Sequence, residues 1–159
     1  MSLLSKDDTQ SNLKLVEKLA VDCYGGNKVL ADLTVAQAIL ESNLADKPSL
    51  LAYKYNNLFG IKGKGTKGSI MLPTTEYVKG KKEFVNQSFA WNGTVEDSIE
   101  QKKKLFQNGT KDKPTRYFKV LSAQTFEAAA QAVYDAGYAT DPNYPKKLIL
   151  IYHKYISKE

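Results

Sequence analysis

The segment VAQAILES, residues 35–42, is an apolar run that ends at a single carboxylate, Glu41. Its pattern predicts a helix over about residues 34–43, capped by Asp32 or Thr34. Apolar neighbours and the negative end of a helix dipole both favour the protonated form of a carboxyl group. Glu41 is therefore a candidate proton donor, although its spacing fits an ordinary surface glutamate better. Gln37 lies one turn earlier on the same face, and we expect it to contact the substrate of Glu41.

A second informative segment is NNLFGIKG, residues 56–63, which follows a short helix expected to begin at Pro48-Ser49. Its first two residues favour a turn, and Gly60 favours a positive φ angle. Two interpretations of Asn57 and Phe59 stay open. They either hold a sugar through an amide and an aromatic ring, or they form a buried turn and part of the core.

The rest of the chain is mostly helical in pattern, with helices expected over about residues 9–24, 94–107 and 125–136 and a final helix that contains Leu148 and Tyr155. Two extended segments, residues 69–78 and 82–91, flank Lys79-Gly80 and predict a β-hairpin. Without repeats or linkers, the 159 residues predict one domain over residues 1–159. The fold class is therefore α+β, mainly helical, with one small hairpin.

The amino-acid composition of the chain limits which partners and cofactors we expect. The chain carries a net charge of +6, with one cysteine and one histidine. No Cys/His spacing suggests zinc, and we expect neither a metal nor an organic cofactor. The basic balance favours an anionic partner such as cell-wall polymer, while no nucleic-acid-binding motif is present. No secretory signal or membrane-spanning run is visible, so we expect synthesis in the cytoplasm and no stable membrane insertion.

The two opening segments, together with TTEY at residues 74–77, VEDSI at residues 95–99 and AGYATDP at residues 136–142, occur in an order that resembles glycoside hydrolase family 73. This family contains the glucosaminidase domains of flagellar rod-assembly proteins and of many autolysins. The similarity covers about residues 13–155. It implies a lysozyme-like fold that cleaves the glycan backbone of peptidoglycan.

The resemblance also implies roles for particular residues. It makes Glu41 the general acid, Glu76 a second carboxylate on the hairpin, and Tyr138 a cleft tyrosine with a catalytic role. It places Asn57 and Phe59 on the cleft wall. Glu83, across the hairpin, is the competing second carboxylate, and an N-acetyl sugar could use its own acetamide instead.

The sequence therefore predicts an endo-β-N-acetylglucosaminidase that acts on peptidoglycan strands as a monomer. An N-acetylmuramidase or lytic transglycosylase on the same scaffold is the first alternative, and a non-catalytic wall-binding module is the second. The expected setting is a phage endolysin or virion-associated lysin that acts on the bacterial wall.

Overall fold

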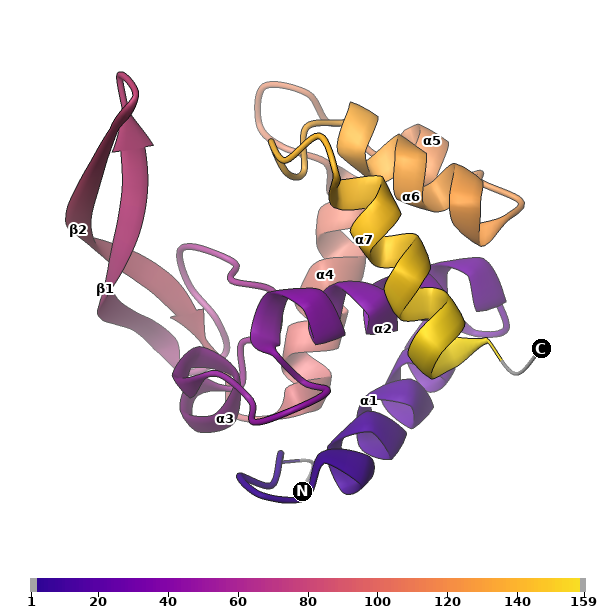
Figure 1. The fold of residues 1–159 in the computed structure, drawn as a ribbon, viewed down its shortest axis with the longest axis horizontal. Helices are drawn as coiled ribbons and strands as arrows, with labels where there is room; N and C mark the ends of the chain where they lie inside the picture. Colours follow the sequence, from indigo (N-terminus) through magenta and orange to yellow (C-terminus); the bar gives the residue numbers. More distant parts are fainter. Residues whose placement is uncertain (1–2, 158–159) are drawn as a thin grey trace.

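A buried helix, α2 (Lys28–Ser42), forms the centre of the computed structural model, which describes residues 3–157. Most of its side chains from Leu30 to Ile39 are buried, so it is apolar on nearly all sides, as the core helix of a domain must be. Helices α1 (Thr9–Tyr24), α6 (Phe126–Asp135) and α7 (Tyr144–Ile151) pack against it, as does the π-helical turn η1 (Tyr152–Ile156). Figure 1 shows α2 enclosed by these helices.

The predicted start of α2 was wrong. The helix begins six residues before Thr34, and the side chain of Asn27 caps it by accepting a 3.1 Å hydrogen bond from the Leu30 amide. The two expected caps have other partners: Asp32 pairs with Lys28, and Thr34 donates to the Tyr24 hydroxyl at 2.9 Å. At its other end α2 stops at Asn43, whose φ of 55° is left-handed. This stop leaves Glu41 in the last turn.

The expected hairpin is confirmed, with strands β1 (Gly68–Val78) and β2 (Lys81–Trp91). The strands are antiparallel, and Glu76 lies directly opposite Glu83. Lys79 and Gly80 both have positive φ, which suits the tight right-twisted turn between them. The hairpin extends away from the helices (Figure 1).

Two asparagines fasten the base of the hairpin to the short helix α3 (Leu50–Tyr55). The Asn56 amide donates to the Asn92 carbonyl at 3.0 Å, and the Asn92 amide donates to the Asn56 carbonyl at 3.2 Å. The oxygen of the Asn92 side chain also accepts a hydrogen bond from the Thr66 amide. These reciprocal bonds fix the direction in which the hairpin leaves the helical part.

The helix α4 (Val95–Asn108), expected over about residues 94–107, packs against α1, and the side chain of Thr94 caps it. The short helix α5 (Phe118–Leu121) connects it to α6. The structure confirms the α+β class with a predominance of helix and one hairpin. None of the helices within residues 3–157 combines the length and apolar character needed to cross a membrane.

Candidate active site

The carboxyl group of Glu41 is held by a chain of two hydrogen bonds that begins in the core. The buried Gln37 side chain donates to the Tyr144 hydroxyl at 3.0 Å. That hydroxyl donates in turn to Oε1 of Glu41, also at 3.0 Å. Because Tyr144 begins α7 and Glu41 ends α2, the packing of these two helices sets the orientation of the carboxyl group.

The environment of Glu41 favours its protonated form. Glu41 as a whole residue is exposed. Neighbouring groups nevertheless remove water from around its carboxyl group, and this raises the pKa of that carboxyl. The hydrogen bond from Tyr144 and the charge of Lys102 oppose this shift without cancelling it. These electrostatics favour a role for Glu41 as a proton donor.

Two open cavities meet at Glu41. The first, of about 490 Å³, is lined by Glu41, Tyr138, Tyr144 and the loop between α6 and α7. The second, of about 460 Å³, is lined by Glu41, Tyr138 and residues of the Phe59–Lys62 turn. The structure therefore brings Glu41, Tyr138 and Phe59 together, as the sequence predicted.

Asp141 also lines the first cavity, but its carboxylate is engaged. It accepts a hydrogen bond from the Asn143 amide at 2.9 Å and pairs with Lys147 at 2.5 Å. These contacts lower the pKa of Asp141, so it is an ionised loop cap and a poor proton donor.

Asn57 is buried, lines neither cavity and has no polar atom left over for a ligand. Its amide nitrogen donates to the carbonyls of Ile61 and Ala90 at 2.9 and 3.0 Å. Its oxygen accepts from the amides of Phe59 and Ile61. Of the two interpretations of Asn57 given above, these hydrogen bonds favour the one in which it forms a buried turn. The Gln37 side chain is also buried, and it reaches the cavity only through Tyr144.

Glu76 stands apart from these cavities, because neither has a hairpin residue in its lining. It is connected to the second cavity through Lys62, which lines that cavity and pairs with Oε1 of Glu76 at 3.4 Å. Glu76 shares the less exposed face of the hairpin with Glu83, but Glu83 has no ion pair among residues 3–157. Through this ion pair, Glu76, and not Glu83, contacts a residue that lines the cavity.

Two residues of the site were missed from the sequence. Tyr144 is not among the residues that the sequence singles out, and its partner Glu41 is 103 positions away. Lys102 is fully buried, and its ammonium donates a 2.6 Å hydrogen bond to the Tyr138 hydroxyl. One signal could have found it: Ile99, Lys102 and Phe106 are spaced as one face of α4, so the lysine interrupts the buried stripe of that helix.

Comparisons with known proteins agree with this geometry. The sequence model of the glucosaminidase family, described as mannosyl-glycoprotein endo-beta-N-acetylglucosaminidase, matches residues 17–157. Exo-glucosaminidase LytG of Bacillus subtilis is 40% identical over 132 residues, which are 83% of this chain and 46% of LytG. Peptidoglycan hydrolase FlgJ of Escherichia coli K12 is 35% identical over 126 residues, 73% of this chain and 37% of FlgJ.

The crystal structure of the catalytic domain of the autolysin Auto from Listeria monocytogenes superposes with a TM-score of 0.82 at 30% identity, covering 96% of this chain and 88% of that domain. The chain spans less than half the length of LytG and of FlgJ. The agreement in fold, sequence and order of motifs shows that this chain belongs to the glucosaminidase family.

Proposed function

We propose that the protein is a peptidoglycan hydrolase that cleaves the glycan backbone as an endo-β-N-acetylglucosaminidase. The observation that carries the proposal is the carboxyl group of Glu41, which has a raised pKa and lies where two open cavities meet. The names of LytG and FlgJ, a glucosaminidase and a peptidoglycan hydrolase, support the same substrate class.

In this mechanism Glu41 gives its proton to the glycosidic oxygen as the bond to the anomeric carbon breaks. The hydrogen bond from Tyr144 to Oε1 holds one carboxyl oxygen, which leaves Oε2 to carry the proton toward the sugar. Tyr138, in both cavities with Glu41, supplies a hydroxyl beside the reacting sugar.

The positive charge that develops at the anomeric carbon needs a partner, and two are available. One is Glu76, held by Lys62 at the edge of the second cavity. The other is the acetamide of the substrate itself. These routes differ in whether loss of the Glu76 carboxylate stops the reaction.

The arrangement of the cavities favours cleavage within a strand. Because Glu41 lines both cavities, sugars can occupy sites on both sides of the bond beside it. Digestion of purified peptidoglycan should release fragments of mixed length, with N-acetylglucosamine at the new reducing ends. Reducing-end muramic acid would indicate a muramidase, and anhydro ends a lytic transglycosylase.

The decisive variant for the acid is Glu41→Gln, which keeps the size and the hydrogen bond from Tyr144. General acid catalysis contributes about 10²- to 10⁴-fold, so the release of reducing ends should fall by about that factor. Glu127→Gln, an exposed glutamate on α6, is the matched control and should behave like the unmodified protein. Activity of Glu41→Gln close to the control would refute the assignment. Binding of walls without turnover by the unmodified protein would favour the non-catalytic alternative.

The biological setting and the oligomeric state are part of the proposal. A net charge of +6 should draw the protein to anionic wall polymers, with binding that weakens as salt rises. The proposed role as a lysin is tested by adding the protein from outside to intact cells and, separately, to cells whose membrane has been permeabilised. Lysis is then compared between the two. Light scattering of the purified protein tests the expected monomer.

A further inference from the structure

The side chain of Lys102 is the one large charged group enclosed in the core of residues 3–157. It has no exposed surface, and the ion pairs of the described residues do not include it. Enclosing an ammonium without a paired carboxylate costs folding free energy. A buried charge that weakens the fold calls for a functional explanation.

Three aromatic rings surround the ammonium. Its nitrogen lies 3.8 Å from the ring centre of Tyr138, 4.6 Å from that of Phe59 and 5.0 Å from that of Phe106. The faces of aromatic rings attract cations, most strongly where water is excluded. These rings therefore offset part of the cost of keeping Lys102 charged, and two of them line the cavity beside Glu41.

The direction of the hydrogen bond between Lys102 and Tyr138 decides what the tyrosine can do. An ammonium has only donors, so a charged Lys102 donates to the phenolic oxygen, which lies 2.6 Å from its nitrogen. The single hydrogen of the Tyr138 hydroxyl is then free to point elsewhere. A neutral amine would instead accept that hydrogen and turn it into the core.

We propose that Lys102 is a positioning residue: its ammonium fixes the Tyr138 hydroxyl so that its hydrogen points into the cavity and is donated to the sugar beside Glu41. The inference rests on the proposed function, since it assigns Lys102 a part in that same reaction. Lys102 itself lines neither of the two cavities, so it acts through Tyr138.

Two opposing effects act on the charge of Lys102, and burial is the larger of them. Burial lowers the pKa of its ammonium well below the usual range, while the negative charge of Glu41 opposes that change. The ionisable groups that face the pair are Glu41 from α2 and, around Tyr138, Tyr24, Tyr117 and Tyr144. Protonation of Glu41 and the charge of Lys102 are thus coupled across Tyr138.

The test is a double-mutant cycle of Lys102→Met and Tyr138→Phe, with kcat and KM measured on soluble glycan fragments. Loss of one hydrogen bond to a charged group should lower kcat of Lys102→Met by about 10- to 100-fold while KM stays close to that of the unmodified protein. With Phe at position 138, the same change at Lys102 should alter kcat by less than about twofold. Equal effects in both backgrounds, or an unchanged kcat, would overturn the proposal.

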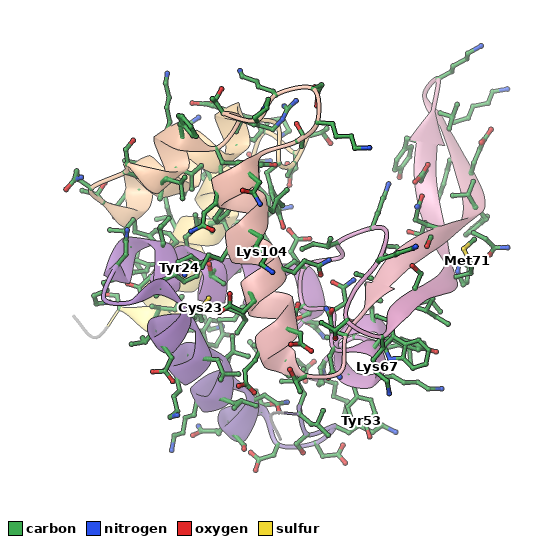
Figure 2. The ribbon with its side chains drawn as sticks, turned by 180° about the vertical axis from the view of Figure 1, so that it is seen from behind. Cys23, Tyr24, Tyr53, Lys67, Met71 and Lys104 are labelled. Atoms are coloured by element: carbon green, nitrogen blue, oxygen red, sulfur yellow. The ribbon has the colours of Figure 1, made fainter. Side chains whose placement is uncertain are left out.

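Stability separates this role from a purely structural one. Lys102→Met replaces a buried charge with an apolar chain of similar length, so its melting temperature should be equal or higher. A purely structural lysine would lose activity and stability together. Lys104→Met, on the exposed side of the same helix (Figure 2), is the matched control and should change neither.

A measurement on Tyr138→Phe covers the case in which Lys102→Met does not fold. The Lys102 side chain should give a lysine NMR signal displaced by its three aromatic neighbours. Its titration midpoint should move to lower pH in Tyr138→Phe, because the ammonium loses its acceptor. An unchanged midpoint would refute the contact. If the unmodified protein and Lys104→Met both fail to cut peptidoglycan, the proposed function is wrong. The NMR titration then still tests the contact between Lys102 and Tyr138.

Discussion

The Tyr144 hydroxyl donates a 3.0 Å hydrogen bond to the Glu41 carboxyl across 103 positions of sequence. Gln37 donates to the same hydroxyl, so its hydrogen is directed at Glu41. Tyr144 therefore both orients the proposed acid and stabilises its ionised form. The proton affinity of Glu41 is a compromise between this bond and the loss of water around the carboxyl.

Tyr144→Phe should shift the pH profile of the proposed glycan cleavage toward alkaline values. The variant lacks the hydrogen bond that lowers the Glu41 pKa, so the pKa rises further. Glu41 must be protonated to act, and activity is lost as pH rises through its pKa. The alkaline limb of kcat against pH should therefore move to higher pH. Movement of that limb to lower pH would contradict the role of Tyr144.

Glu41→Gln should make the protein more stable at neutral pH than it is with glutamate. The Glu41 pKa is raised in the folded state, so the unfolded chain loses this proton more readily. Its contribution to stability falls as pH rises from about 4.3, the usual pKa of a glutamate, through the raised folded value. Melting curves of the two proteins should coincide near pH 3 and separate above pH 5. A lower melting temperature for the variant at pH 7 would contradict this account.

Glu76→Gln and Glu83→Gln form a matched pair on opposite strands of the hairpin. If Glu76 assists at the anomeric carbon, its variant should lose about 10²-fold or more in kcat, while Glu83→Gln stays active. Neither should lower the melting temperature much, because the Lys62–Glu76 pair is partly exposed. Full activity of Glu76→Gln would assign the role to the substrate acetamide.

Asn57→Ala should act on stability and leave substrate binding alone. It removes a side chain with four hydrogen bonds inside the NNLFGIKG turn, and buried partners stay unpaired. We expect a loss of about 2–4 kcal/mol in the free energy of unfolding, measured with denaturant. Asn86→Ala, at an exposed position on β2, is the control. A large rise in KM without loss of stability would restore the sugar-binding interpretation.

Local signals in the sequence were sufficient for most of the secondary structure. The helix α1 has the expected bounds because Gly25, with a φ of 56°, ends it. The hairpin was predictable because Lys79-Gly80 separates two alternating segments. The start of α2 was not predictable, because Asp32 and Thr34 are equally good caps in the sequence. Only the fold shows that both have other partners.

The site was predictable only in part, because its members are joined by packing. Glu41 and Tyr138 were found through motifs, and no local rule pairs Tyr144 with Glu41. The residue type of Lys102 argued against placing it in the site. A lysine is nearly always solvent-exposed, so only its place in the apolar stripe of α4 marks Lys102 in the sequence, and the structure is needed to show that it is enclosed.

The reciprocal hydrogen bonds between Asn56 and Asn92 hold the hairpin at its base, so the hairpin can pivot there as one rigid arm. Apart from the Lys62–Glu76 pair, its hydrogen bonds to the helical part lie near its base, at residues 68–69 and 88–92. Glu76 is eight residues beyond Gly68, or about 26 Å at the usual rise of a strand, so a pivot of about 10° would carry its carboxylate through about 5 Å. The carboxyl spacings of retaining and inverting glycosidases differ by about 1–4 Å. If Glu76 assists at the anomeric carbon, the stiffness of the two asparagines at the base of the hairpin would govern which of these two stereochemical courses the reaction follows.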